Sequence, residues 1–163
     1  MGRRPPRSAF APDVFVFPGG SLQADDFAAA VALAPDCQRL AARSGRRARA
    51  LARTALRETE EETGLIVGPE TLTLIARAIT PAGSPIRFHA RFFHADAAGA
   101  SGQLGGDGEL ADLGFRPLDQ SLRLPIMDVT EAVLRAVQAS GGAPPAPFLF
   151  SYRRGKPAPR ALA

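Results

Sequence analysis

An acidic run near the middle of the chain places the strongest constraint on what it can fold into. Glu58 is followed by three consecutive glutamates at positions 60–62, and Gly64 lies two residues further on. The stretch 46–63 is rich in Ala, Leu and Arg, which favour helix. Glycine commonly follows a helix C-terminus because it adopts positive φ without strain. The pattern predicts one helix over 46–63 that carries the acids in its last turns.

Three of these acids share one face of the predicted helix. Glu58, Glu61 and Glu62 are spaced i, i+3 and i+4, and their face borders the apolar side of the helix. Like charges at these spacings repel by about 0.2–0.5 kcal/mol per pair, and the helix dipole disfavours anions near a C-terminus. A solvated acidic face is the plain interpretation. Because a hard divalent cation such as Mg²⁺ or Mn²⁺ would remove both penalties, we predict a metal site here.

The remainder of the chain is basic. The net charge is +4 and the isoelectric point about 10.5, and Lys156 is the only lysine, so the basic residues are almost all arginine. Guanidinium groups bind phosphate oxygens in pairs, so this composition favours a phosphate-bearing partner. With 163 residues, 45% of them hydrophobic, the chain can form one complete core. We expect a single domain over 1–163.

Several protein classes are excluded by the sequence. Cys37 is the only cysteine, which excludes internal disulfides and cysteine-rich zinc sites. The longest apolar run, 28–34, is far shorter than the ~20 residues that span a membrane. Prolines interrupt the basic N-terminal segment where a signal peptide needs an apolar core. We expect a cytoplasmic protein with no membrane partner, and a homodimer is left open.

Strands are expected on both sides of the acidic helix. β-Branched and aromatic residues predict strands over 13–17, 71–80, 86–95 and near 113–118. A second helix is predicted over 128–139, capped by Asp128, and a mobile glycine-rich loop over 97–108. Strands that can pair directly, interleaved with two substantial helices, predict an α/β sandwich with a mixed sheet.

Two segments together resemble the Nudix box, whose pattern is G-x5-E-x7-R-E-U-x-E-E-x-G-U with U apolar. Residues 57–65, Arg-Glu-Thr-Glu-Glu-Glu-Thr-Gly-Leu, match its second half, and residues 17–20, Phe-Pro-Gly-Gly, match the strand and turn that open the first half. The resemblance implies a Nudix-like α/β/α sandwich. It also implies a Mg²⁺- or Mn²⁺-dependent pyrophosphohydrolase whose small-molecule substrate is a nucleoside diphosphate derivative.

The resemblance also implies roles for individual residues. The expected metal ligands are Glu58, Glu61, Glu62 and the carbonyl region of Gly20. Glu58 is in addition a candidate general base, and Arg57 is its expected orienting partner, paired with an acid one turn further on. Gly19 and Gly20 are expected to contact the substrate.

The first half of the box departs from the pattern. Gly20 and Arg57 are 37 positions apart where the pattern has 14, so an insertion is predicted over about 27–49. Asp26 is the nearest substitute for the box glutamate, and Thr59 replaces an apolar residue. The inserted box is similar to the Nudix subgroup of coenzyme A diphosphatases. Coenzyme A or acyl-CoA is therefore the first substrate expected, and ADP-ribose or a dinucleotide the second.

Both ends of the chain carry further expectations. Only residues 1–12 precede the strand expected at 13–17, so a fold that lacks the usual first strand is left open. The segment 140–163 is expected to form an extended tail with an aromatic patch, which packs as a strand more readily than it stacks on bases.

A few other residues carry weaker signals. Glu109 follows the glycine-rich loop, where related enzymes hold another catalytic carboxylate, and a plain loop acid is the alternative. Arg87 and Arg91 share a strand face and are candidate ligands of substrate phosphate, with a solvated face as the alternative. His89 and His94 lack metal-ligand spacing, so ordinary surface or core positions are expected.

Two other functions are left open. The basic composition motivates a nucleic-acid-binding module, although the basic stretch 39–53 has no interleaved aromatic residue. A catalytically inactive Nudix-like binding domain is the second alternative. The arginines within 39–49 also suggest that the insertion acts as a basic flap over an anionic substrate, with Ser44-Gly45 as its hinge.

Overall fold

A computed structural model of the chain describes residues 1–28, 31–81, 83–84 and 86–162. Residues 29 and 30 of the predicted insertion and residue 163 of the predicted tail lie outside this described part. The α-helices are α1 (Pro35–Ala41), α2 (Gly45–Thr63), α3 (Leu118–Ser121) and α4 (Asp128–Ala139). Short 3₁₀ turns are η1 (Asp25–Phe27), η2 (Pro69–Thr71) and η3 (Ala97–Gly99). The strands are β1 (Gly2–Arg3), β2 (Phe15–Val16), β3 (Leu65–Ile66), β4 (Thr73–Ile79), β5 (His89–His94), β6 (Ser101–Gly102), β7 (Phe148–Phe150), β8 (Tyr152–Arg153), β9 (Lys156–Pro157) and β10 (Arg160–Ala161).

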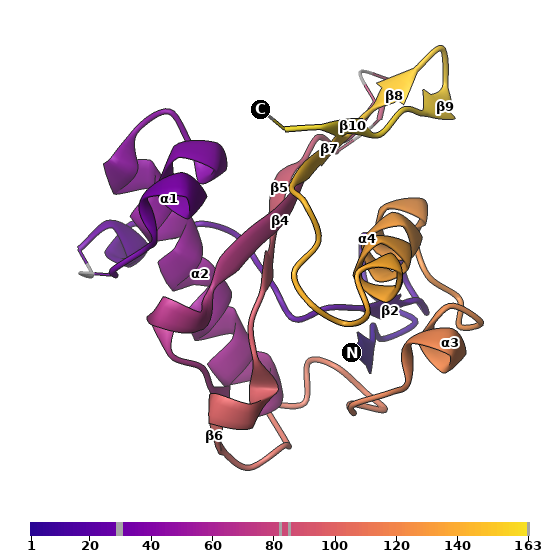
Figure 1. Cartoon of the computed structure of the whole chain (residues 1–163). Helices are drawn as coiled ribbons and strands as arrows, with labels where there is room; N and C mark the ends of the chain where they lie inside the picture. The colour runs from indigo at the N-terminus through magenta and orange to yellow at the C-terminus, as the bar shows by residue number, and fades with distance from the viewer. Residues whose placement is uncertain (29–30, 82, 85, 163) are drawn as a thin grey trace.

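The centre of the molecule is a mixed sheet with helices on both sides (Figure 1). Its strand order is β10-β7-β4-β5, and β7 runs parallel to β4 while the other neighbours are antiparallel. One face packs on α1 and α2 through Cys37, Ala41, Ala48 and Leu74. The opposite face packs on α4 through Ile75, Ala76 and Val133. The predicted α/β sandwich with a mixed sheet is confirmed.

Helix α2 follows the sequence prediction closely. It begins one residue before the expected start and ends at Thr63, and Gly64 adopts a φ of 72° as the residue after the helix. Its small buried residues, such as Ala48 and Ala52, let the helix lie close to the sheet. Helix α4 also matches its predicted range, although Met127 occupies the N-cap position and Asp128 lies in the first turn.

Three strand predictions need correction. The described residues contain no strand near 113–118, where Gly114 exchanges backbone hydrogen bonds with Met1 and the chain then enters α3 behind Pro117. The strand expected over 86–95 is confined to β5, and Ile86 and Phe88 are exposed rather than half-buried. At the N-terminus, the two-residue strand β1 precedes β2 and pairs antiparallel with it, so the first twelve residues do contain a strand.

The segment 97–108, predicted to be a mobile loop, contains regular structure. It contains η3 and β6, and β6 pairs with β3 immediately after the end of α2. Gly64 and Gly102 approach so closely that a Cβ on either would overlap the backbone of the other segment. The glycines here allow backbone to pack on backbone, rather than giving the loop freedom to move.

The predicted insertion is a packed element in its described residues. Cys37 and Ala41 of α1 are buried against Ala48 and Leu74. The guanidinium of Arg46 lies 5.3 Å from the ring centre of Phe27, so the two ends of the insertion meet. The basic flap over the substrate is therefore wrong, because Arg46 and Arg47 lie at the opposite end of α2 from the acids. At 1.5 Å per residue, Arg47 and Glu58 are about 16 Å apart along the helix axis.

The C-terminal tail completes the sheet. Phe150 of β7 is buried, and its strand pairs with β4, as the packing interpretation of the aromatic patch expected. β8 and β9 form a hairpin beyond it, and the Tyr152 hydroxyl donates a hydrogen bond to Asp128 at the start of α4. Within the described part of the chain, no helix combines the length and apolar character that crossing a membrane requires.

Candidate metal-dependent hydrolytic site

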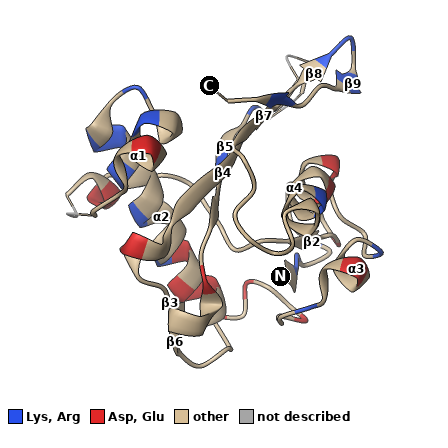
Figure 2. Cartoon of the chain, in the orientation of Figure 1, with Lys and Arg blue, Asp and Glu red and all other residues tan. Residues whose placement is uncertain are grey.

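The glycine turn meets the acidic end of α2. The backbone N–H of Gly19 donates to Glu62 Oε2 at 2.8 Å, joining residues 43 positions apart. Gly20 lies so close to Glu58 that a Cβ at position 20 would overlap the Glu58 carboxylate. The two halves of the motif are therefore adjacent despite the insertion between them, and they form the acidic region at the lower end of α2 in Figure 2.

Arg57 joins the carboxylates of the site to one another. Its NH1 group donates to Glu58 Oε1 at 2.7 Å and to Glu61 Oε2 at 2.9 Å. Its Nε and NH2 groups donate to Asp26 at 3.2 and 3.3 Å. The predicted pairing with an acid one turn on is thus present, and the hydrogen bond to Asp26 contributes most to a raised Arg57 pKa. Arg57 is held in one orientation from both ends of the motif.

Asp26 anchors this network from the far side of the insertion. Its side chain is 2% exposed and also accepts hydrogen bonds from the Thr54 hydroxyl and the Gln23 N–H. Burial alone would raise the pKa of the Asp26 carboxyl, but the hydrogen bonds from Arg57, Gln23 and Thr54 bring it below its usual value. Asp26 therefore ties the segment after the glycine turn to Arg57 and Thr54 of α2.

Glu62 is a buried carboxylate surrounded by other acids. The residue is 4% exposed, and burial raises its pKa to about 7 against the opposing hydrogen bond from Gly19. The negative charges of Glu109, Glu58 and Asp107 raise it further. A cation bound here would favour the ionised form of Glu62 over the protonated form.

The glycine-rich loop brings Asp107 and Glu109 to this end of α2. The N–H groups of Gly105 and Asp107 donate to the carbonyls of Thr63 and Glu61, both at 2.9 Å. Gly106 has a φ of 67° and touches the Glu62 backbone, where a Cβ would overlap the Glu62 carbonyl oxygen. Asp107 is a candidate that sequence reasoning missed, although it lies only two residues before the predicted Glu109.

The donor set suits a hard divalent cation, although the acids are not gathered for one. No three His, Cys, Asp or Glu side chains among the described residues are arranged to hold a metal ion. Glu61, half exposed, points to Arg57, which also holds Glu58. Carboxylate oxygens are nevertheless the ligands that Mg²⁺ prefers. Of the three acids near Glu62, which are Glu58, Asp107 and Glu109, only Glu58 forms an ion pair within the described residues, and its partner is Arg57. The residues fit a metal site in composition, and to complete it Glu61 would have to turn from Arg57 while Glu58 offers the oxygen that Arg57 does not contact.

The predicted phosphate ligands Arg87 and Arg91 do not lie at the carboxylates. Arg91 donates through Nε to the Ala41 carbonyl of α1, and Arg87 is exposed in the connection between β4 and β5. Neither is brought to the carboxylates. His89 accepts a hydrogen bond from Arg77, and His94 contacts the Gly142 carbonyl, so both histidines have ordinary partners.

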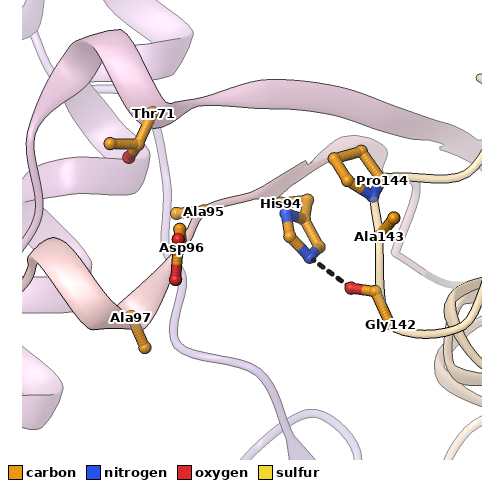
Figure 3. A pocket seen from close by; sticks show the side chains of 8 residues that line it. All are labelled: Thr71, His94, Ala95, Asp96, Ala97, Gly142, Ala143 and Pro144. Carbon is orange, nitrogen blue, oxygen red and sulfur yellow. Dashed lines mark hydrogen bonds between the residues drawn. The ribbon is translucent and has the colours of Figure 1, made fainter.

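A hollow at the end of β5 is also separate from the carboxylates. It encloses about 620 Å³ between the end of β5 and the segment after α4, and no predicted site residue lines it (Figure 3). Its lining residues are Thr71, His94, Ala95, Asp96, Ala97, Gly142, Ala143 and Pro144. One oxygen of the Asp96 carboxylate caps η3 by accepting from the Ala98 N–H, and His94 contacts the Gly142 carbonyl across the hollow.

Comparison with known proteins finds the same architecture in a solved structure. The chain is similar to a NUDIX hydrolase from Alicyclobacillus acidocaldarius, with a TM-score of 0.60 and 25% sequence identity over 89% of this chain and 83% of that one. No protein-family model and no curated protein matches the sequence. The structural match confirms the predicted Nudix fold and supports the prediction of a Nudix-type hydrolase.

Proposed function

We propose that the chain is a Mg²⁺- or Mn²⁺-dependent pyrophosphohydrolase that cleaves the diphosphate linkage of a nucleoside diphosphate derivative. One observation carries the proposal. The carboxylates at the end of α2 lie against the Gly19-Gly20 turn, and Arg57 is clamped between them and Asp26. The similar solved structure is described as a NUDIX hydrolase, which is consistent with this chemistry.

The ligands proposed for the metal are Glu58, Glu61 and Glu62, with the backbone of Gly20. A bound divalent cation would neutralise diphosphate oxygens and lower the pKa of an attacking water. If Glu61 turns to bind the metal, Arg57 loses this one partner and keeps Glu58 and Asp26. Glu61 is the partner that would move, because its carboxylate is the most exposed of the three. Arg57 therefore keeps Glu58 in place while the site is loaded.

The chemical step needs a base and an in-line approach. Glu58 or Glu109 accepts the proton of the attacking water as its oxygen bonds to phosphorus, and the bond from phosphorus to the bridging oxygen breaks. The bridging oxygen leaves with the second phosphate. Glu62 is buried and accepts the Gly19 N–H, so in this proposal the remaining backbone groups of the Gly19-Gly20 turn contact substrate oxygens.

The substrate class is assigned by resemblance. Coenzyme A or an acyl derivative is the first candidate, and ADP-ribose or a dinucleotide the second. Neither Arg87 nor Arg91 is offered as a ligand of the scissile diphosphate, since neither reaches the carboxylates. The homodimer and the cytoplasmic location stay predictions, and sedimentation of the purified chain tests the former.

The direct test is a panel of diphosphate compounds incubated with the protein and Mg²⁺, with products identified by mass spectrometry. Release of 3′,5′-ADP and phosphopantetheine from coenzyme A is the expected result, whereas AMP and a sugar phosphate would support the second candidate. Glu60→Gln is the matched control for Glu62→Gln, because Glu60 is exposed and lies off the Glu58 face. No turnover of any compound with Mg²⁺ or Mn²⁺ would favour the inactive binding domain.

A further inference from the structure

The N-terminal end of α2 and the nearby sheet face form a second charged region, opposite in sign to the first. The segments 37–56, 71–95 and 132–163 contain no Asp or Glu, yet they hold fourteen of the twenty Lys and Arg residues. Figure 2 shows these blue positions around α1, the start of α2 and the upper part of the sheet. Among the described residues, Arg39 and Arg135 form ion pairs with Asp36 and Glu131, which lie just outside these segments.

Two arginines face each other directly across neighbouring strands. Arg77 of β4 and Arg91 of β5 are cross-strand partners, and like charges in that position destabilise a sheet. Their shared face is the one covered by α1, because Arg91 Nε donates to the Ala41 carbonyl at 2.9 Å. Arg160 of β10 lies in the same cross-strand row, two strands beyond Arg77, since both residues pair with Leu149.

A third arginine and a histidine complete the cluster. His89 Nε2 accepts from Arg77 NH2 at 3.1 Å, so this ring nitrogen carries no proton. Burial and the charges of Arg91, Arg77 and Arg47 all lower the His89 pKa. Burial, with the charges of Arg77 and Arg47, lowers the pKa of Arg91 to about 10. The positive charge of Arg47, at the start of α2, therefore adds to the potential around these two strand residues.

Arg91 donates to the Ala41 and His89 carbonyls, whereas one donor of Arg77 has no partner among the described residues. Arg77 Nε is buried and, in the described structure, donates to no acceptor. None of the ion pairs recorded for the described residues includes Arg47, Arg77 or Arg91. Arg47 also lies in the first turn of α2, which has no acidic residue and whose dipole adds positive potential. A solvated basic face does not require a buried, unsatisfied donor.

We propose that Arg47, Arg77 and Arg91, with His89, form a binding site for a phosphate dianion, either inorganic phosphate or a terminal phosphomonoester. A guanidinium group can bind two such oxygens at once, and Arg77 and Arg91 lie side by side on neighbouring strands, while Arg47 adds positive charge from the first turn of α2. The site is separate from the carboxylates, because Arg47 and Glu58 lie about 16 Å apart along α2. It does not depend on the proposed hydrolytic activity.

Thermal unfolding in a chelator tests this site without metal chemistry. With 10 mM inorganic phosphate in place of chloride at equal ionic strength, the wild type is expected to melt about 5 °C higher, as for a ligand well above its Kd. Arg77→Gln and Arg47→Gln should lose at least about half of this shift. The matched control Arg153→Gln, which removes the same charge from exposed β8, should retain it.

The same melts show whether the cluster is strained by its own charge. Without phosphate, Arg77→Gln should be no less stable than the wild type, because the substitution removes a like-charge pair. The proposal is overturned if the wild type gains nothing from phosphate beyond the effect of ionic strength, or if Arg77→Gln and Arg47→Gln both keep the full shift.

AMP and a short single-stranded oligonucleotide identify the source of the phosphate. A shift with AMP as large as that with inorganic phosphate supports recognition of a terminal phosphomonoester, and a shift with inorganic phosphate alone supports the free ion. The oligonucleotide tests for a diffuse basic surface instead of a compact site. If inorganic phosphate gives no shift, and Arg153→Gln weakens oligonucleotide binding as much as Arg77→Gln does, the compact site is contradicted.

Discussion

The two ends of α2 carry opposite charges, and each carries the charge that its helix dipole disfavours. The first turn holds Arg46 and Arg47 with no acid, and the last turn holds Glu60, Glu61 and Glu62 with no base. Such a charge costs about 0.3–1 kcal/mol where it is exposed. A helix that served stability alone would have the reverse arrangement. We infer that each end keeps its charges for a counterion, a cation at the acidic end and an anion at the basic end.

The ends differ in how the protein compensates for them. At the acidic end, Arg57, the Gly19 N–H and the N–H groups of the glycine-rich loop already contact the carboxylates and the helix carbonyls. At the basic end, Arg91 contacts the Ala41 carbonyl, and no carboxylate of the described chain pairs with Arg47. The acidic end is therefore partly organised before any ligand binds, whereas the basic end depends more on one.

Removing the anchor of the acidic end should have the largest effect on stability. Asp26→Ala leaves Arg57 and Thr54 without their buried partner, so we expect a loss of about 3–5 kcal/mol in the free energy of unfolding. Asp36→Ala is the matched change near the basic end, where Asp36 and Arg39 form an exposed pair 3.6 Å apart, and it should cost about 0–1 kcal/mol. Urea unfolding measures both. Equal losses would mean that the acidic end is no better organised than the basic end.

Removing a ligand from the acidic end should have the largest effect on activity. Glu62→Gln should lower kcat by about 10²–10³-fold, the range typical of removing one group that stabilises transition-state charge. Glu60→Gln, on the same turn but off the carboxylate face, should stay within about twofold, well inside the effect of one such group. Steady-state hydrolysis with Mg²⁺ compares the two. Full activity in Glu62→Gln would remove Glu62 from the mechanism.

The buried acid at this end should make metal-free stability depend on pH. Because the folded-state pKa of Glu62 is about 7 against an ordinary value of 4.5, the folded protein binds a proton that the unfolded chain releases between these values. Stability should therefore fall as pH rises from about 4.5 to 7, by roughly 1–3 kcal/mol from this group. In EDTA, Glu62→Gln should lose this part of the pH dependence. A parallel pH profile for the two proteins would show that Glu62 is not strained without metal.

The glycine-rich loop provides a finer test of the acidic end. Gly106→Ala adds a Cβ that overlaps the Glu62 carbonyl, so it should destabilise the fold by about 1–3 kcal/mol and lower activity by displacing Asp107. Gly108 also has a positive φ, 89° against 67° for Gly106, but open space around it, so Gly108→Ala should cost about 1–2 kcal/mol less than Gly106→Ala. Equal melting temperatures for the two variants would show that the loop is not docked on α2.

The smallest effect concerns the dipole itself. Arg47→Gln and Glu60→Gln each remove one disfavoured charge, one from either end, and each should raise the stability of the ligand-free protein by about 0.3–1 kcal/mol. The gains should shrink at high salt because exposed charges are screened. Chemical unfolding at low and high salt measures this. A loss of stability in both variants would contradict the idea that these charges oppose folding.

Features that depend on neighbouring residues in the sequence were predicted correctly. The bounds of α2, the left-handed Gly64 and the Arg57–Glu61 pair follow from helix propensity and from i, i+4 spacing, and all are present. Asp26 was found by counting residues from the glycine turn, and its contact with Arg57 gives that position its physical reason.

The errors lie where the partner is distant in sequence. Glycines between 97 and 108 were interpreted as freedom of motion, but Gly102 and Gly106 are required because the backbone of α2 lies against them. For Arg91 the sequence left a phosphate ligand and a solvated face open, and β5 turns its side chain toward α1, where Nε donates to the Ala41 carbonyl. Nothing in the local pattern of either segment specifies which backbone lies opposite.

The most direct test of the acidic end is calorimetric titration of Mg²⁺, or Mn²⁺, into the metal-free protein. The wild type should bind the cation saturably and release protons near pH 6.5, because Glu62 is partly protonated there without metal. The double variant Glu61→Gln/Glu62→Gln should not bind, while Glu60→Gln should bind as the wild type does. Equal binding by the double variant and the wild type, or no binding by the wild type, would contradict a metal site at the end of α2.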